Sequence, residues 1–357
     1  MKKTVGILML AAMVLMAGCG GGSSSSSDNK TASKGEKQVL NIYSWTDYYA
    51  PEVLADFEKE NNCKITYDVF SNNEELLAKM QAGGSQYDII QPSDYMVTTM
   101  LKLGMLEKLD VSKIPNWEKM DKALRKPAFD PEGVYSPVFT YGITGIVYNK
   151  KYIKNPPKDW NDLWNPEYKG HVILLNDCRE VFSVALKKNG KSNNSKNQAE
   201  VEKAFQDLKE LNKNVLAYDT ENIKQKFISE EGWIGMMWSG DAAFSHRENP
   251  DIGFMVPPQG SLIWADTIAI PKGCKNKELA EKFINYMMDP KVSAKNTNVI
   301  MLPNPIPEAV KLMDDKYKSD PILKIGADSS KLGEWLVDIG DAITMYDKYW
   351  TELKASK

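Results

Sequence analysis

The chain has 357 residues, of which 42% are hydrophobic, so it can bury a sizeable core and is long enough for two domains. Its formal net charge is −3, and removing Lys2 and Lys3 with an N-terminal leader lowers this by two to −5. This mildly acidic balance argues against a nucleic-acid partner. Past the leader there is no apolar run of about 18 residues, so no transmembrane helix is predicted.

Residues 1–18 are predicted to form a signal peptide, with Lys2 and Lys3 as its charged start and residues 7–16 as its apolar stretch. Its end, Leu-Met-Ala-Gly-Cys at 15–19, resembles the bacterial lipobox, which implies lipidation of Cys19; a conventional secretory signal is the alternative. Residues 19–37 would then be the lipidated cysteine and a flexible tether. We expect an exported protein, anchored to the outer face of the cytoplasmic membrane through Cys19, or periplasmic.

The folded body begins near residue 38 and alternates strands with helices. Strands are predicted at 39–43, 64–69 and 87–90. One helix is predicted to begin at Pro51, a second to cover 73–82, and a third to follow the last strand and end at residue 103. Alternation of this kind predicts a parallel α/β sheet. Ligands bind such sheets outside the carboxyl ends of the strands, which draws attention to the residues that follow each strand.

The strand predicted at 142–149 would cross into a second domain. There the patterns predict helices and strands in turn. The expected strands are 171–175, 215–218, 233–238, 254–256, 261–264 and 267–271, and the expected helices are 160–164, 179–188, 199–211, 278–288 and 332–353. Cys63, Cys178 and Cys274 are expected to be free thiols, although one disulfide is possible in an exported protein.

Three predicted strand ends place an aromatic ring beside an acid, at 45–48, 238–241 and 264–266. Aromatic rings cover methylene groups and attract ammonium groups, and carboxylates add charge-assisted hydrogen bonds. The pattern therefore favours a small organic cation as ligand, while ring packing in the core and helix capping are the structural alternatives. The candidate rings are Trp45, Tyr48, Tyr95, Trp238 and Trp264, and the candidate acids are Asp47, Asp177, Glu180, Asp241 and Asp266.

Signatures of enzymes are weak in this sequence. It has two histidines, His171 and His246, and no GxSxG, HExxH, P-loop or strand-linked GxGxxG motif. Paired carboxylates leave a secreted hydrolase as an alternative. The clustered acids could also bind Ca²⁺, but their aromatic neighbours suit a cation with an apolar body better than a metal ion. We expect no catalysis, no metal and no cofactor.

Six stretches occur in an order that resembles the spermidine/putrescine-binding proteins of bacterial ABC importers. They are residues 41–48, 92–95, 163–170, 177–182, 238–240 and 264–266, and the resemblance extends from about Val39 to the C-terminus. It implies a type II periplasmic-binding-protein fold, α/β with two lobes and the ligand between them. Lobe 1 would comprise residues 38–143 and 265–310, and lobe 2 residues 144–264 and 311–357.

The resemblance also implies roles for single residues. Trp45, Tyr95, Trp238 and Trp264 would enclose the polyamine chain, Asp177, Glu180 and Asp266 would hold its amines, and Thr46, Tyr48 and Ser93 would add polar contacts. Asp47 and Asp241 match acids of putrescine-preferring members. Met301-Leu302 and Leu336 replace a Tyr and a Gln of the spermidine binders, which favours putrescine or mixed specificity.

The implied function is that of a monomeric receptor that captures putrescine or spermidine and delivers it to the permease subunits of an ABC importer. A binding protein for another solute, such as an amino acid, a sugar or iron, is the main alternative. An amino-acid receptor normally needs an arginine for the carboxylate, and Arg179 is the arginine nearest to the motifs.

Overall fold

The computed structural model describes residues 37–84, 86–327 and 332–356. The predicted signal peptide, Cys19 and nearly all of the predicted tether lie outside these residues. None of the helices in the described ranges has the length and apolar content that a membrane span requires.

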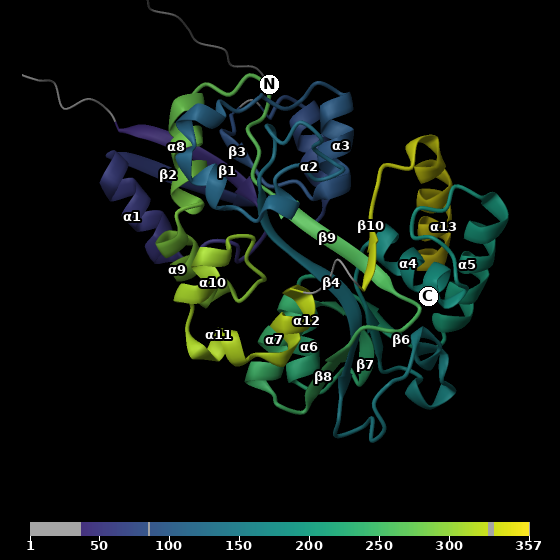
Figure 1. Ribbon diagram of the computed structural model, residues 1–357. Coiled ribbons are helices and arrows are strands. Elements are labelled where there is room, and N and C mark those ends of the chain that lie inside the picture. The colour runs from purple at the N-terminus through teal and green to yellow at the C-terminus, as the bar shows by residue number, and fades with distance from the viewer. Residues whose placement is uncertain (1–36, 85, 328–331, 357) are drawn as a thin grey trace, which may run out of the picture. The chain divides into compact units, whose positions relative to one another are not determined.

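The first sheet is parallel and has the strand order β2-β1-β3. Its strands are β1 (Gln38–Ser44), β2 (Cys63–Val69) and β3 (Ile89–Ile90), and α1 (Pro51–Asn61), α2 (Asn73–Gln81) and α3 (Asp94–Lys102) follow them in turn. Pro51 suits the first turn of α1 because its missing N–H has no helical partner there. This half confirms the predicted alternation of strands and helices (Figure 1).

The second sheet is mixed and has the order β10-β9-β4-β7-β5-β6, with β8 paired to β4. Strand β4 (Val138–Asn149) runs antiparallel to β7 (Ile234–Trp238), β8 (Ile252–Met255) and β9 (Ser261–Thr267). Strand β5 (Val172–Leu174) lies parallel to β6 (Val215–Tyr218) and β7, and β10 (Gly333–Trp335) lies parallel to β9. The helices that accompany this sheet are α4 (Cys178–Lys188), α5 (Gln198–Leu211), α6 (Ile223–Ile228), α7 (Ser239–Glu248) and α13 (Ile343–Ala355).

Strands β4 and β9 connect the regions around the two sheets. In Figure 1 they run from the part of the chain that holds β1 and β3 towards the part that holds β7 and β8. Isolated bridges tie Ile90 to Ala269 and Ser93 to Asp266, so the chain around β9 also contacts the first sheet's loops. The architecture is therefore α/β with two sheet regions joined by crossing strands.

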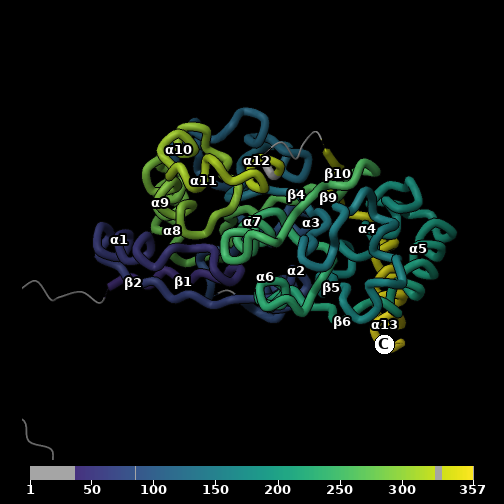
Figure 2. The backbone as a smooth tube through the Cα atoms, turned by 90° about the horizontal axis from the view of Figure 1, so that it is seen from below, coloured from purple at the N-terminus to yellow at the C-terminus, as the bar shows by residue number. Residues whose placement is uncertain are grey.

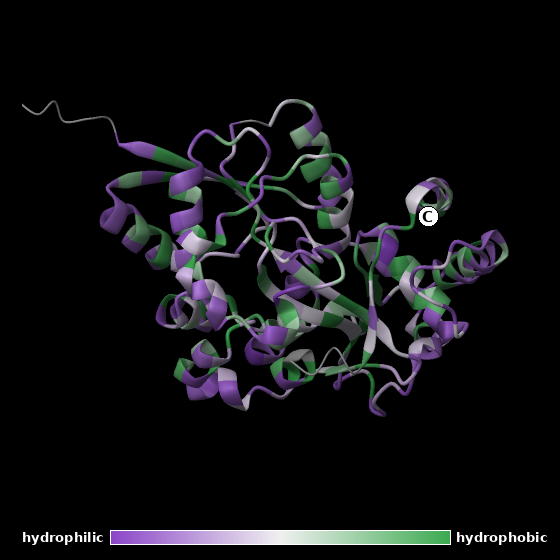
Figure 3. Cartoon of the chain, turned by 45° about the horizontal axis from the view of Figure 1, so that its top comes forward, coloured by the Kyte–Doolittle hydropathy of each residue, from purple (hydrophilic) through white to green (hydrophobic). Residues whose placement is uncertain are grey.

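Five further helices follow β9, and two of them pack on elements already described. They are α8 (Lys277–Met287), α9 (Pro290–Ile300), α10 (Pro307–Leu312), α11 (Asp315–Ser319) and α12 (Pro321–Ala327). Helix α9 contacts α1, and α12 packs on α7. Figure 2 shows α8, α9 and α1 on one side of the body and α4, α5 and α13 on the other. In Figure 3 the outer helices alternate hydrophilic and hydrophobic residues, and hydrophobic residues are frequent in the central strands.

Several local predictions differ from the structure. The strand end predicted at 238–241 continues directly into α7, whose first turn contains Gly240 and Asp241, and a Cβ on Gly240 would lie 2.1 Å from Leu302 Cδ2. Strand β9 continues past the predicted end at Trp264 as far as Thr267, so Trp264 lies inside the strand and Asp266 lies next to its end. The strand predicted at 267–271 is replaced by isolated bridges at Ala269 and Pro271. Residues 333–335 are strand rather than helix, because they pair with β9.

The three cysteines in the described ranges, Cys63, Cys178 and Cys274, are free thiols.

Candidate ligand-binding site

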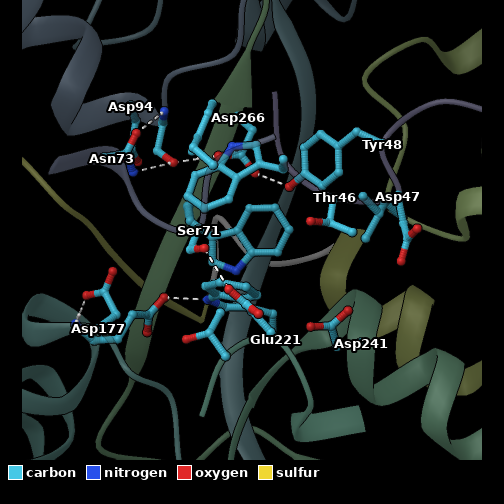
Figure 4. A pocket seen from close by; sticks show the side chains of 18 of the residues that line it. Thr46, Asp47, Tyr48, Ser71, Asn73, Asp94, Asp177, Glu221, Asp241 and Asp266 are labelled. Atoms are coloured by element: carbon cyan, nitrogen blue, oxygen red, sulfur yellow. Dashed lines mark hydrogen bonds between the residues drawn. The ribbon is translucent and has the colours of Figure 1, made fainter. Parts of the chain in front are cut away.

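A cavity of about 210 Å³ lies where the ends of several strands meet β9. One water needs roughly 10–15 Å³ of such volume, so the space suits a small organic molecule. All twelve residues that the sequence predicted as a binding site line it. They are Trp45, Thr46, Asp47, Tyr48, Ser93, Tyr95, Asp177, Glu180, Trp238, Asp241, Trp264 and Asp266. Figure 4 labels six of them, namely Thr46, Asp47, Tyr48, Asp177, Asp241 and Asp266.

The loop after β1 supplies one wall of this cavity. Trp45 Nε1 donates a hydrogen bond of 3.0 Å to the carbonyl oxygen of Gln91, and the Tyr67 hydroxyl donates to the carbonyl of Trp45. Asp47 has a positive φ of 61°, which few residues other than glycine adopt, and the turn exposes its side chain. The loop therefore fixes the Trp45 ring at the cavity and leaves the Asp47 carboxylate exposed at its edge.

Asp266 is a buried carboxylate near the C-terminal end of β9. It accepts a hydrogen bond of 2.6 Å from Ser93 Oγ and another from the Tyr48 hydroxyl, and Asn73 Nδ2 donates to Ser93 Oγ at 2.9 Å. Burial raises the pKa of Asp266 to about 6, although both hydroxyls act in the opposite direction by stabilising the charged form. No Lys or Arg in the described ranges forms an ion pair with it, so an external cation would be stabilised here.

Asp177 and Glu180 lie at the N-terminus of α4, where the helix dipole favours negative charge. Asp177 caps the helix by accepting a hydrogen bond of 3.0 Å from the Glu180 backbone N–H. The predicted capping role is therefore correct for Asp177, and the same side chain also lines the cavity. Glu180 accepts hydrogen bonds from Trp238 Nε1 at 2.6 Å and from Thr144 Oγ1 at 2.8 Å. Burial and the neighbouring Asp177 raise the pKa of Glu180 to about 8.

The three tryptophans form a chain of tilted rings. The ring centroids of Trp45 and Trp238 are 6.5 Å apart, and those of Trp238 and Trp264 are 6.4 Å apart. Gly142 lies opposite Trp264 on β4, and a Cβ there would lie 2.5 Å from the Trp264 ring. Leu336 packs with Trp264 in a small buried cluster. Together these side chains give the cavity an apolar surface suited to methylene groups.

Lys224 of α6 was not predicted and is the single basic residue among the described residues that line the cavity, against seven acidic ones. Its Nζ lies 3.6 Å from Asp241 Oδ1 and 3.8 Å from Asp47 Oδ2. Burial raises the pKa of Asp241, and Lys224 opposes that rise.

The sequence interpretation also missed residues that follow β2 and β6. The first group is Phe70, Ser71 and Asn73, and the second is Thr220, Glu221 and Lys224. Both groups lie just after the carboxyl end of a parallel strand, so applying the strand-end rule to every strand would have found them. The remaining missed lining residues are Asp94 and Leu262, and the two substitution sites Leu302 and Leu336 also line the cavity.

Glu74, beside the cavity, was missed as well. It accepts a hydrogen bond of 3.1 Å from the Tyr95 hydroxyl and remains partly exposed to solvent. Partial desolvation at the cavity, together with the charge of Asp177, raises its pKa to about 7.

The chemistry of the site follows from this lining. Carboxylates surround a surface of aromatic rings, so the cavity suits a ligand with positive charges on an apolar chain. Arg179, which an amino-acid ligand would need, is buried and hydrogen-bonds instead to Asn194 Oδ1 at 3.0 Å and to the Asn193 carbonyl at 3.3 Å. In the described ranges no three His, Cys, Asp or Glu side chains are grouped closely enough to hold a metal ion.

Comparisons with known proteins agree with the fold and the site chemistry. A family model for bacterial extracellular solute-binding proteins matches residues 52–325. The spermidine/putrescine-binding periplasmic protein of Escherichia coli K12 is 36% identical over 330 residues, which cover 91% of this chain and 94% of that protein. The putrescine-binding periplasmic protein SpuD of Pseudomonas aeruginosa is 30% identical over 350 residues, which cover 91% of this chain and 94% of that protein.

A solved structure shows the same likeness in three dimensions. The spermidine/putrescine ABC transporter substrate-binding protein PotD of Streptococcus pneumoniae matches with a TM-score of 0.78 at 32% identity, covering 90% of this chain and 99% of that one.

Proposed function

Because the chain belongs to the bacterial extracellular solute-binding protein family, we propose that it is a receptor that captures a polyamine, putrescine or spermidine, and delivers it to an ABC permease. The observation that supports this most is the position of three buried or half-buried acids, Asp177, Glu180 and Asp266, beside tryptophan rings in one cavity. Relatives that are 36% and 30% identical to this chain are named for binding spermidine and putrescine, and putrescine, respectively.

In this proposal the ligand's ammonium groups take the place of the absent cationic side chains. One ammonium hydrogen-bonds to Asp266, and another to Asp177 and Glu180. The rings of Trp45, Trp238 and Trp264 cover the methylene groups between them, and Tyr95, Thr46, Tyr48 and Ser93 complete the contacts. Binding is the whole of the chemistry, so the protein acts without catalysis, metal or cofactor.

Putrescine is the favoured ligand in this proposal. Leu302 and Leu336 line the cavity and offer no hydrogen-bonding group to a third amine, and an unsatisfied ammonium would weaken binding. Putrescine has about 6 heavy atoms, and the best small ligands reach roughly −1.5 kcal/mol per atom. The resulting limit of about −9 kcal/mol corresponds to a Kd near or slightly below micromolar.

The proposed mechanism is closure of two lobes around the polyamine, with lobe 1 at residues 38–143 and 265–310 and lobe 2 at residues 144–264 and 311–357. Repulsion among the acids would disfavour closure without a cation, so the ligand would stabilise the closed form. The receptor would act as a monomer, held at the membrane by lipidated Cys19, within reach of the permease.

A thermal-shift screen of the purified protein tests this function. Putrescine and spermidine should raise the melting temperature in a concentration-dependent manner, since a ligand that binds the folded state stabilises it. Cadaverine, glutamate and maltose serve as comparison ligands. Stabilisation by glutamate or maltose, with none by either polyamine, would show that the receptor takes another class of solute.

A further inference from the structure

One side of the cavity already contains a positive charge, and it belongs to the protein. The Nζ of Lys224 lies 3.6 Å from Asp241 Oδ1, 3.8 Å from Asp47 Oδ2 and 5.3 Å from the centroid of the Phe244 ring. The two carboxylates come from separate elements, the loop after β1 and the first turn of α7. Lys224 therefore has the surroundings expected of a bound ammonium group: two acids and an aromatic face.

The acids elsewhere in the cavity differ in this respect. Within the described residues, Asp177, Glu180 and Asp266 take part in no ion pair with a lysine or arginine, and the bonds found for Glu180 and Asp266 come from neutral donors. Figure 4 shows Asp177 and Asp241 on opposite sides of the cavity, with Asp266 apart from both. The cavity thus combines acids without a cationic partner with one end, formed by Asp47 and Asp241, whose two negative charges Lys224 partly neutralises.

We propose that Lys224 acts as an internal ammonium group that occupies the Asp47–Asp241 end of the cavity and thereby selects against polyamines with a third positive charge. This inference rests on the proposed polyamine-binding function. A third ligand ammonium directed to that end would meet the charge of Lys224 and would compete for carboxylates that are already paired. A diamine whose ammonium groups reach Asp177, Glu180 and Asp266 avoids that competition.

A purely structural role would leave a different signature. Ser71 Oγ donates a hydrogen bond of 2.6 Å to Glu221 Oε1, so the segment before α6 also contacts the chain after β2 without any ligand. If Lys224 served only to strengthen this contact between elements, its removal would change the affinities for all ligands by a similar factor. The ratio of the affinities for a triamine and a diamine separates the two roles.

The test is calorimetric titration of the wild-type protein and of Lys224→Met with putrescine and spermidine at one pH and ionic strength. The affinity for spermidine relative to putrescine should rise at least about tenfold in Lys224→Met (about 1.4 kcal/mol). Lys226→Met is the matched control, because Lys226 lies on the same helix and also approaches two acids, Asp219 at 3.9 Å and Glu231 at 3.6 Å, outside the cavity. It should leave the ratio unchanged.

Three more variants secure the interpretation. Lys224→Arg preserves the charge and should retain most of the wild-type ratio, and Lys224→Gln tests the same prediction if Lys224→Met does not fold. Adding Asp47→Asn to Lys224→Met should return the ratio towards the wild-type value, because it removes a carboxylate that the third ammonium would have gained.

The outcomes are distinct. A ratio that stays within twofold of wild type in folded Lys224→Met, including an equal change for both ligands, overturns the role of Lys224 in selectivity. If the wild-type protein itself binds neither polyamine, the proposed function fails instead.

Discussion

Replacing Asp266 by asparagine separates binding from stability, because the two should change in opposite directions. The substitution preserves the shape of the side chain and removes the charge that would pair with a ligand ammonium. A hydrogen bond to a charged group contributes about 1.5–3 kcal/mol, so the Kd for putrescine should rise about 10- to 150-fold. Ser93 donates to Oδ1 of Asp266 and Tyr48 to Oδ2, so asparagine keeps an acceptor for one of the two hydroxyls and can donate its Nδ2–H to the oxygen of the other. The local fold should therefore persist.

The stability of the ligand-free protein should not fall. The pKa of Asp266 rises from 3.8 to about 6 on folding because the group is buried. Each pKa unit corresponds to about 1.4 kcal/mol, so ionising this carboxyl in the folded state costs about 3 kcal/mol at pH 8. Asp266→Asn removes that cost and should stabilise the ligand-free protein by up to this amount at pH 8. The gain should disappear below about pH 4, where Asp266 is protonated in both the folded and the unfolded state.

Calorimetry for the Kd and urea unfolding for the stability together test this prediction. Asp130→Asn is the control, because Asp130 is equally buried but lies outside the cavity and accepts backbone N–H groups of Gly133, Tyr135 and Ser136 at 2.8–3.0 Å. That variant should lose stability and keep its Kd within about twofold. An Asp266→Asn protein that binds putrescine as tightly as wild type would refute the assignment of Asp266 to the ligand.

Three further predictions follow from the same geometry. The pKa values of about 8 for Glu180 and about 7 for Glu74 mean that both carboxyls are partly protonated near pH 7 in the ligand-free site. A bound cation lowers both pKa values, so binding should release protons and the Kd should rise as the pH falls from 8 to 6. Equal binding enthalpies in phosphate and Tris would contradict this. Trp238→Phe keeps an aromatic ring but removes the 2.6 Å hydrogen bond to Glu180, which should weaken putrescine binding about tenfold by calorimetry; an unchanged Kd would assign that bond a structural role alone. Gly142→Ala would place a methyl group 2.5 Å from the Trp264 ring, so the ring or the strand must shift. Urea unfolding should show a loss of about 1–3 kcal/mol in the free energy of unfolding. An unchanged free energy of unfolding would mean that the ring moves at no cost.

The sequence predicted the parallel first sheet well because its signals are local. Strand β1, the proline that starts α1 and the helix α2 each depend on residues within one element. The errors arose where a distant part of the chain decides the conformation. Gly333 joins a strand because β9 lies beside it, and the close approach of the Leu302 side chain to Gly240 likewise comes from a distant segment.

The candidate site shows the same division. Strand ends and the family resemblance predicted twelve residues that line one cavity, which agrees with the rule that ligands bind at the carboxyl ends of strands. Lys224 was missed because a lysine in the short helix α6, which buries Ile223 and Phe227, has no sequence pattern that marks a binding site. Its importance depends on the approach of Asp47 and Asp241, which are distant from it in the chain.

Titration of the purified wild-type protein with putrescine in a calorimeter tests the central claim most directly. We predict saturable binding of one putrescine per chain with a Kd near or below micromolar, accompanied by proton release near pH 7. The absence of any binding heat for putrescine and spermidine, together with saturable binding of an amino acid or a sugar, would contradict the assignment of this protein as a polyamine receptor.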